Sequence, residues 1–302
     1  MEAVMLACDW GTTNLRAWTL DAAGDVVQSQ EFPLGVSRLE PGEAATRFAS
    51  EVRPALGADH LPAMLCGMIG SNLGWSPAAY ADCPAGLDDL ADALHTPPGD
   101  RLARIVPGVR CAGFGGQSDV MRGEETQLFG WLAADPARAQ GLRVVCHPGT
   151  HAKWMLVEDG RLVRFVTAMT GEIYAVLSAH SVLKSAGGVH DAAAFAEGLA
   201  AAGQGDALAA RLFTARSRVV GGGAPAASTA SYLSGLLIGA DVAATPRLLL
   251  AGDGRAVDLL GDPELCTLYG QALTANGVET HLHDGETAAA AGLFALFQKV
   301  RW

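Results

Sequence analysis

Short apolar runs separated by Gly- and Asp-containing turns open the chain. They cover residues 3–7, 15–20 and 26–27, a pattern that predicts three strands joined by tight turns. The same pattern returns over 143–169 and predicts a second meander of strands. Longer stretches with apolar residues three and four positions apart follow each meander and predict helices. The chain is therefore expected to be α/β, with two similar halves.

The helices are expected to be alanine-rich and amphipathic, and the last of them to pack back toward the first half. A Pro-containing turn at 135–138 predicts the boundary between an N-terminal lobe, 1–138, and a C-terminal lobe, 139–302. The segment 77–107 is expected to cap the first lobe with helices and loops. Short buried strands are expected at 64–69 and 247–251, and helices at 41–56, 124–134, 173–184, 192–201, 207–219, 227–243 and 286–300.

The two meanders share a phrase. Cys8-Asp9-Trp10-Gly11-Thr12 occurs in the first, and Cys146-His147-Pro148-Gly149-Thr150 occurs in the second, close to half a chain later. Each copy stands between two predicted strands. Two such units suggest two related lobes, each presenting a backbone loop to one ligand. A two-lobed phosphotransferase holds a nucleotide in this way.

Composition narrows the function classes. A chain of 302 residues, 50% of them hydrophobic, can form two cores. The formal net charge of −11 argues against a nucleic-acid partner. The apolar stretch 233–244 contains Asp241 and is too short to span a membrane. Six cysteines without a C-x-x-C pair, and a start without a basic leader, predict a cytoplasmic protein. A homo-oligomer is compatible with these features.

The first shared loop carries groups suited to phosphate. Gly11 at the apex of a tight turn exposes backbone N–H groups, and the hydroxyls of Thr12 and Thr13 add donors. Asp9 at the strand end is placed to hold Mg²⁺, which prefers one or two carboxylates together with phosphates. An ordinary hairpin turn with a capping Asp explains the same residues.

The second shared loop repeats the apex with Gly149 and Thr150 and adds Lys153. The chain has only three lysines, so Lys153 is a candidate phosphate ligand, although a solvated strand lysine is the alternative. A third candidate is the apolar run that ends in Gly252-Asp253-Gly254, a common seat for a nucleotide. It lacks the third glycine of a dinucleotide-binding loop, because Val257 stands there.

Acidic residues gather before the second loop. Asp119, Glu124 and Glu125 lie near Arg122 at the start of a predicted helix. Acidic residues at a helix N-terminus are often only capping residues. The alternative is a catalytic role. In that case one of the three carboxylates is a general base that accepts a hydroxyl proton in phosphoryl transfer, and the arginine lies near an anionic substrate. On chemistry alone all three carboxylates stay candidates.

At this point the chain resembles the 2-dehydro-3-deoxygalactonokinases, over almost its full length. That family lies within the superfamily of sugar kinases, heat-shock ATPases and actin. The matching stretches include DWGTTNLRAW at 9–18, GVSRL at 35–39, GMIGSNLGW at 67–75, VMRGEETQL at 120–128 and PGTHAKW at 148–154. MTGE at 169–172, LSGLLIGAD at 233–241 and GETAAAAGL at 285–293 extend the match. The resemblance implies a two-lobed actin-like, ribonuclease H-like fold with an interlobe cleft.

The resemblance further implies transfer of a phosphoryl group from ATP, with Mg²⁺, to the 6-hydroxyl of 2-dehydro-3-deoxy-D-galactonate in galactonate breakdown. It favours Glu124 as the base, with Asp119 in reserve. The implied phosphate ligands are Asp9 with Mg²⁺, Gly11, Thr12, Thr13, Gly149, Thr150 and Lys153, and the adenosine neighbours are Ala251 and Gly252. The implied sugar-acid ligands are Arg16, Arg38, Ser71, Asn72, Trp75 and Arg122, with the carboxylate on one of the three arginines.

Two departures and three rival readings stay open. His147 and Ala152 stand where the family pattern suggests an apolar residue and a small hydroxyl or thiol. One rival is a kinase of a related acid such as 2-dehydro-3-deoxygluconate. Another is an ATPase or regulator of the same fold, which would have no need for VMRGEETQ and GMIGSNLGW. An NAD-dependent oxidoreductase is disfavoured by the missing glycine.

Overall fold

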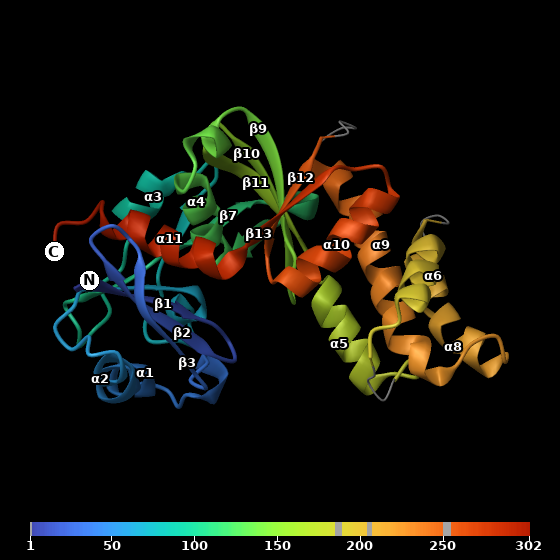
Figure 1. Ribbon diagram of the computed structural model, residues 1–302, viewed down its shortest axis with the longest axis horizontal. Coiled ribbons are helices and arrows are strands. Elements are labelled where there is room, and N and C mark those ends of the chain that lie inside the picture. The colour runs from blue at the N-terminus through green and yellow to red at the C-terminus, as the bar shows by residue number, and fades with distance from the viewer. Residues whose placement is uncertain (1, 185–188, 204–206, 250–254) are drawn as a thin grey trace. The chain divides into compact units, whose positions relative to one another are not determined.

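Two five-stranded sheets share one strand order in the computed structural model, which describes residues 2–184, 189–203, 207–249 and 255–302 (Figure 1). The first sheet runs β3 (Val26–Phe32), β2 (Leu15–Asp21), β1 (Ala3–Trp10), β4 (Ala63–Cys66), β6 (Ala103–Ile105). The second runs β11 (Arg161–Ala168), β10 (Ala152–Glu158), β9 (Leu142–His147), β12 (Val257–Gly261), β13 (Thr280–Asp284). A smaller sheet contains β5 (Tyr80–Asp82), β7 (Gly108–Ala112) and β8 (Ser118–Met121). Both predicted meanders and the α/β class are confirmed.

The duplication extends to the register of the strands. β1 is antiparallel to β2 and parallel to β4, with Cys8 opposite Leu65. In the second sheet β12 is parallel to β9, with Leu259 opposite Cys146. Cys8 and Cys146 hold the same place in the shared phrase, so the two parallel pairs correspond residue for residue.

The chain divides into two compact units. Unit 1 comprises Met1–Leu142, Val157–Arg164 and Asp284–Trp302, and unit 2 comprises Arg143–Leu156 and Phe165–His283. The helices of unit 1 are α1 (Glu43–Arg47), α2 (Arg53–Ala55), α3 (Leu87–Asp92), α4 (Glu124–Ala133) and α11 (Gly285–Phe297). Those of unit 2 are α5 (Thr170–His180), α6 (Ala192–Ala202), α7 (Leu208–Leu212), α8 (Thr214–Val220), α9 (Thr229–Leu249) and α10 (Pro263–Ala275).

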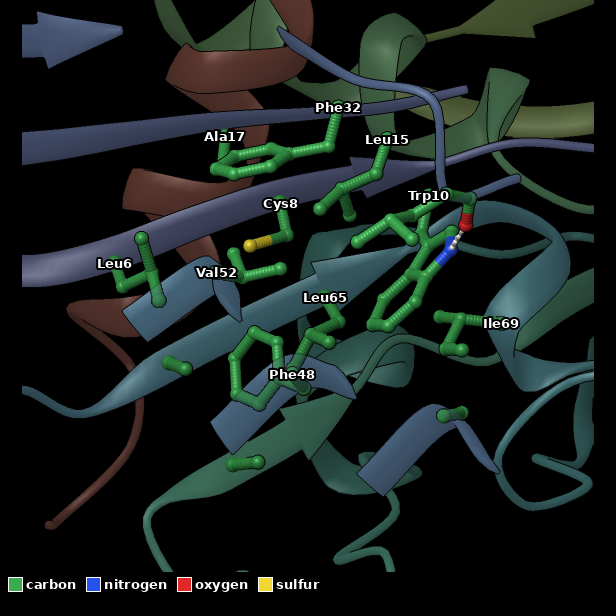
Figure 2. Close-up of a cluster of buried hydrophobic side chains, with 14 of the residues drawn as sticks. Leu6, Cys8, Trp10, Leu15, Ala17, Phe32, Phe48, Val52, Leu65 and Ile69 are labelled. Carbon is green, nitrogen blue, oxygen red and sulfur yellow. Dashed lines mark hydrogen bonds between the residues drawn. The ribbon is translucent and has the colours of Figure 1, made fainter. Parts of the chain in front are cut away.

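One face of the first sheet packs on the helical segment 43–55. This segment runs from α1 through a π-helical turn, Phe48–Val52, into α2. Figure 2 shows Phe48 and Val52 facing side chains of the strands, among them the buried Trp10. The indole N–H of Trp10 donates to the carbonyl oxygen of Leu34 (Figure 2). The first Gly-Thr loop therefore follows a strand that is anchored in a closed core.

The other face of the first sheet is covered by α11, which also packs against α4 (Figure 1). Two glycines allow the helices to touch. A Cβ on Gly130 would lie 1.9 Å from the carbonyl oxygen of Ala288, and one on Gly292 would lie 2.1 Å from that of Thr126. Any side chain at either position would push the helices apart. This contact fixes α4, the helix that begins with Glu124.

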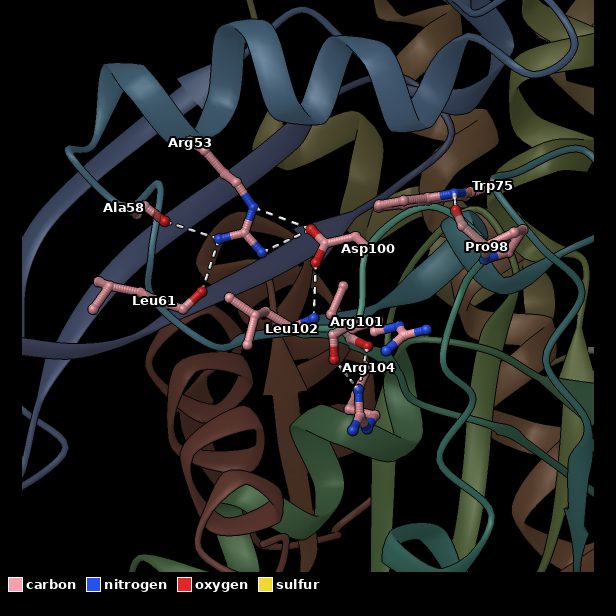
Figure 3. A network of polar contacts seen from close by, with 10 residues as sticks. Arg53, Ala58, Leu61, Trp75, Pro98, Asp100, Arg101, Leu102 and Arg104 are labelled. Atoms are coloured by element: carbon pink, nitrogen blue, oxygen red, sulfur yellow. Dashed lines mark hydrogen bonds and ion pairs between the residues drawn. The ribbon is translucent and has the colours of Figure 1, made fainter. Parts of the chain in front are cut away.

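A buried arginine holds the edge of the first sheet together. Arg53 in α2 donates to the carbonyl oxygens of Ala58 and Leu61, both at 2.8 Å (Figure 3). Its Nη2 also pairs with Asp100 Oδ2 at 2.9 Å. A cation shielded from water is tolerated only when it is paired and hydrogen-bonded. The network ties α2 to the loop that leads into β6.

The predicted helices are confirmed with shifted ends, and two strand predictions are corrected. The strand expected over 64–69 ends at Cys66, because Gly67 has a φ of +86° and a 3₁₀ turn, Gly67–Gly70, follows. The strand expected over 247–251 is wrong up to residue 249, because α9 continues to Leu249, and 250–251 lie outside the described residues. A buried helix end and a buried strand give the same apolar run. The segment 77–107 contains β5, α3 and β6, and so strands as well as a helix.

Candidate active site

The first Gly-Thr loop is a closed turn with exposed hydroxyls. The N–H of Gly11 donates to the carbonyl oxygen of Asn14 at 3.0 Å, and the N–H groups of residues 35–37 donate to the carbonyls of Thr13, Gly11 and Thr12. These bonds use the loop's carbonyl groups and leave the side chains of Thr12 and Thr13 exposed. Asp9, Gly11, Thr13, Asn14 and Arg16 line one surface pocket of about 240 Å³.

Asp9 lies where three backbone segments converge. It stands at the end of β1, and a Cβ on Gly67 would lie 3.2 Å from its Oδ1. Gly67 in turn faces Gly123, since a Cβ on Gly123 would lie 3.3 Å from the Cα of Gly67. Glycines at both positions let the end of β4 and the start of α4 approach the carboxylate.

Charges of both signs act on Asp9. The pKa of Asp9 is raised to about 6, mainly by burial; Arg16 and a hydrogen bond with Cys66 lower it, and the carboxylates of Glu124 and Glu286 add smaller contributions that raise it. Glu286 of α11 also accepts a hydrogen bond from Trp18 Nε1 at 3.3 Å. A carboxylate at a strand end, with two more carboxylates close enough to act on it, is suited to a cation.

The structure separates the three candidate carboxylates. Glu125 is completely buried, and it accepts the N–H of Gly123 at 2.9 and 2.7 Å and the hydroxyl of Thr126 at 3.1 Å. Burial, followed by the charge of Glu124, raises the pKa of Glu125 to about 7. Glu124 is only half-buried and acts on the pKa of Asp9. Asp119 lies on β8 opposite Cys111 and is not among the main influences on Asp9.

The predicted sugar-side residues follow the 3₁₀ turn Gly67–Gly70. Ser71 Oγ accepts the N–H of Leu73 at 3.2 Å, and Asn72 is exposed. Trp75 packs on Phe48, with ring centroids 5.5 Å apart, and donates from Nε1 to the carbonyl oxygen of Pro98 at 3.0 Å (Figure 3). Trp75 therefore already has a structural partner at each end of its side chain.

The three candidate arginines have different surroundings. Arg16 on β2 is exposed and acts on Asp9, and Arg38 is exposed in a 3₁₀ turn, Val36–Arg38. The guanidinium of Arg122 stacks over the ring of Tyr80 at 4.4 Å and donates from Nη2 to the carbonyl oxygen of Ala78 at 2.8 Å. Within the described part of the chain, Nε and Nη1 of Arg122 are shielded from solvent and have no hydrogen-bond acceptor.

The second Gly-Thr loop joins β9 to β10 and is braced by the start of α5. The N–H of Glu172 donates to the carbonyl oxygen of Thr150 at 2.9 Å, and its carboxylate pairs with His151 at 2.5 Å. A Cβ on Gly171 would lie 2.4 Å from the carbonyl oxygen of Gly149, so only glycine fits. Lys153 is 4% exposed and donates from Nζ to Thr167 Oγ1 at 2.9 Å.

A pocket that the sequence did not reveal lies beside this loop within unit 2. Its volume is about 250 Å³, and its wall is mainly apolar. Its lining includes Gly149, Gly171, Tyr174, Ser234, Leu237 and Tyr269. The predicted adenosine neighbours Ala251 and Gly252 lie outside the described residues. The internal repeat could have given one clue to this region. If the repeat is extended beyond the shared phrase, β12 corresponds to β4, and its last residue, Gly261, lies beside His147 and Pro148 before the second loop.

A buried carboxylate supports one wall of this pocket. Asp241 in α9 accepts four hydrogen bonds, from the side chains of Trp154, Thr170, Thr245 and Tyr269, at 2.6 to 3.0 Å. These donors come from β10, α5, α9 and α10. Thr170 and Tyr269 also line the pocket. Asp241 therefore fixes the helices that shape the pocket relative to β10.

Two kinds of feature are absent from the described ranges. No described helix is both long enough and apolar enough to cross a membrane. No group of three or more His, Cys, Asp or Glu side chains among these residues is arranged to hold a metal ion.

Comparison with known proteins covers nearly the whole chain. Residues 9–296 match the family described as 2-keto-3-deoxy-galactonokinase. The chain is 36% identical to a 2-dehydro-3-deoxygalactonokinase of Escherichia coli (strain K12), with 99% of both chains covered. It is also 36% identical to DgoK1 of Rhizobium meliloti (strain 1021), assigned as the same enzyme, with 96% of this chain and 95% of the relative covered.

Solved structures agree in fold. A crystal structure of a Sinorhizobium meliloti protein assigned as a 2-dehydro-3-deoxygalactonokinase has a TM-score of 0.86 at 35% identity, covering 97% of this chain and 98% of that one. An activator of 2-hydroxyisocaproyl-CoA dehydratase from Clostridium difficile, solved with ADPNP, has a TM-score of 0.50 at 12% identity, covering 98% and 95%. The second likeness concerns the fold alone, which is that of the actin-like ATPases and sugar kinases.

Proposed function

The chain belongs to the 2-keto-3-deoxy-galactonokinase family, and from this premise we propose that it phosphorylates the 6-hydroxyl of 2-dehydro-3-deoxy-D-galactonate with ATP. The products are ADP and 2-dehydro-3-deoxy-6-phosphogalactonate. The observation that carries the proposal is the family match over residues 9–296. The reaction belongs to galactonate breakdown in the cytoplasm, and a homo-oligomer is compatible with it.

Glu124 is proposed as the general base. It is half-buried at the start of α4, and its charge reaches Asp9, so it can face both the reacting groups and water. Glu125 holds the helix start instead, because its carboxylate is occupied by the N–H of Gly123 and the hydroxyl of Thr126. Asp119 stays in reserve on β8. Glu124 would accept the proton of the sugar hydroxyl as the phosphoryl group arrives.

Asp9 is proposed to hold Mg²⁺. Asp9 is a carboxylate at the end of the first loop's strand, with Glu124 and Glu286 close enough to act on it, and a single carboxylate fits an ion that takes most of its ligands from phosphates and water. When bound, the ion would neutralise charge on the transferring phosphoryl group. Arg16, next to Asp9 in the pocket, would add a fixed positive charge near the phosphates.

The nucleotide is proposed to use both Gly-Thr loops. The hydroxyls of Thr12 and Thr13, the backbone N–H groups that follow Gly11 and the backbone at Gly149 would donate to phosphate oxygens, while the N–H of Gly11 itself closes the turn through Asn14. Thr150 is exposed beside Gly149 and would contribute in the same way. Lys153 is covered, so we expect it to support the loop through Thr167 unless it is released on binding. The apolar pocket beside Gly149 would receive the adenosine.

Arg122 is the arginine we propose for the substrate carboxylate. Two of its nitrogens, Nε and Nη1, are buried without an acceptor, which is costly for a cation, and a carboxylate would supply an acceptor to one of them. Because Tyr80 and Ala78 lie against this guanidinium, the segment between them would shift when the carboxylate binds. Ser71 and Asn72 would contact the sugar hydroxyls, with Trp75 beside them as a packed support.

The test is ADP release from Mg·ATP with 2-dehydro-3-deoxygalactonate, its gluconate epimer and ordinary hexoses. Release that depends on the galactonate acid supports the proposal, and a preference for the epimer would change the substrate. Release without any sugar would instead favour an ATPase. Glu124→Gln should lower kcat about 10²- to 10⁴-fold with the KM for ATP nearly unchanged. Glu125→Gln serves as the matched variant and should keep most of the turnover.

A further inference from the structure

Two of the six cysteines differ from the others in their surroundings. Cys8, Cys66, Cys146 and Cys266 are buried, whereas Cys83 and Cys111 are half-exposed. Cys111 lies on β7 of the small sheet and Cys83 directly follows β5, and neither cysteine has a role in the proposed mechanism. All six are reduced in the structure.

The backbone places Cys83 and Cys111 side by side. β5 and β7 are parallel, with Asp82 opposite Arg110 as their last pair, and the N–H of Cys83 donates to the carbonyl oxygen of Arg110 at 2.9 Å. Cys83 and Cys111 are the residues that directly follow this pair, one on each segment, and so lie next to each other. Neighbouring strands lie about 4.8 Å apart, within the Cα separation of about 4.4 to 6.8 Å that a disulfide requires.

The two thiols are also in contact with each other. A side-chain hydrogen bond joins them and, together with burial, raises the pKa of the Cys83 thiol. The ion pair of Asp82 and Arg110 is formed by the preceding residue of each strand, and side chains alternate along a strand, so it lies on the opposite face. The thiols therefore meet without a charged group between them.

We propose that Cys83 and Cys111 are a redox dithiol that a peroxide converts to an intrachain disulfide. The Cys111 thiolate attacks one peroxide oxygen, the O–O bond breaks, and Cys111 becomes a sulfenic acid as hydroxide leaves; this hydroxide takes up the proton that the Cys111 thiol had released to solvent and becomes the first water. The sulfur of Cys83 then attacks that of Cys111, the S–O bond breaks, and the Cys83 proton leaves with the hydroxide as the second water. Two thiols are oxidised and one peroxide is reduced. A thiol reductant reverses the change.

The sheet that carries this pair also leads into the candidate active site. Cys111 is opposite Asp119 on β8, and β8 ends at Met121, directly before Arg122 and Gly123. On the opposite side of the sheet, Ala78 before β5 and Tyr80 at its start contact the Arg122 guanidinium. Oxidation would thus covalently join β5, which contacts Arg122, to β7, the neighbour of the strand that leads into Arg122.

The experiment treats the whole folded protein with hydrogen peroxide, blocks remaining thiols with an alkylating reagent and measures intact mass and peptide masses. We expect the loss of two hydrogen atoms, one disulfide-linked peptide pair containing Cys83 and Cys111, and full recovery with dithiothreitol. Cys266→Ser, a buried control in α10, should behave like the wild type. Cys83→Ser should stop at an oxidised Cys111 without a disulfide.

Four results would overturn the inference. Three concern the wild type: a disulfide through another cysteine, alkylation of both Cys83 and Cys111 after peroxide treatment, or independent oxidation of each to an acid. The fourth is a Cys83→Ser variant that still loses two hydrogen atoms. The readout is mass, so it stands whether or not the kinase assay succeeds.

Discussion

Glu125 offers the sharpest test of the different roles that we assign to the two carboxylates at the start of α4, Glu124 as the base and Glu125 as a buried structural residue. Its pKa rises from an ordinary 4.5 to about 7, so ionised Glu125 costs the folded protein about 3 kcal/mol relative to the unfolded chain. Below pH 4.5 the carboxyl is neutral in both states and the cost is absent. Between pH 4.5 and 7 only the unfolded state ionises, so the free energy of unfolding falls by about 1.4 kcal/mol per pH unit. Above pH 7 the loss is complete.

Glu125→Gln removes this titration and keeps the shape of the side chain. The buried amide would leave an N–H without an acceptor, so the variant starts less stable at acidic pH by about 1 to 3 kcal/mol. Relative to the wild type it should then gain about 2.5 kcal/mol between pH 5 and pH 8. Other groups that titrate in both proteins cancel in this difference.

The assay is urea unfolding of both proteins at pH 5, 6, 7 and 8, followed by fluorescence and circular dichroism. Glu158→Gln is the matched control, because Glu158 lies exposed at the end of β10. Its difference from the wild type should not change with pH. A Glu125→Gln difference that varies by less than about 0.5 kcal/mol over this range would refute an elevated Glu125 pKa. Only its burial and its hydrogen bonds with Gly123 and Thr126 would then distinguish Glu125 from Glu124.

The remaining predictions concern ligands. Asp9→Asn should raise the Mg²⁺ concentration for half-maximal activity at least about tenfold, and an unchanged Mg²⁺ titration would exclude Asp9 as the ligand. Activity of the wild type should fall below pH 6, because Asp9 is then protonated. Arg122→Lys should raise the KM for the sugar acid roughly 10- to 100-fold and leave that for ATP unchanged, with Arg38→Lys as the comparison; equal effects would reject the choice of Arg122. Leu237→Trp should fill the apolar pocket and raise the KM for ATP about tenfold; a normal KM would place the adenosine elsewhere.

The sequence predicts well those parts of the fold that local interactions determine. Both meanders consist of neighbouring strands joined by tight turns, so periodicity and turn residues suffice to find them. The start of α4 at Glu124 also follows from the pattern, because Gly123 and two acidic residues mark a helix N-terminus. The implied role of Glu124 came from resemblance, and it still awaits a test.

Long-range packing is what the residue pattern could not predict. Asp241 was visible only as a charge inside an apolar stretch, but the fold surrounds it with donors from four elements. The apolar run at 247–251 lacked any local sign that α9 would continue to Leu249. Trp75 looked like a sugar-side residue, and its indole is held by Phe48 and Pro98. Each depends on partners far away in the chain.

The duplicated strands place a glycine at the same position in each half of the chain. A Cβ on Gly67 would meet the carbonyl oxygen of Trp10 and the side chain of Asp9, and one on Gly261 would meet those of Pro148 and His147. The shared phrase pairs Trp10 with Pro148 and Asp9 with His147, so both glycines fill one structural place.

The two halves differ in the side chain that faces this glycine. In the first half it is the carboxylate of Asp9, one residue before the end of β1, and in the second it is the imidazole of His147, the last residue of β9. A single cation needs only one of the two halves to supply a carboxylate, and a second one near the phosphates would repel them. The lack of a carboxylate at position 147 is therefore expected if unit 1 holds the metal and unit 2 holds only the nucleotide. His147→Asp should leave the fold intact and weaken ATP binding, and tighter Mg·ATP binding in that variant would contradict this division.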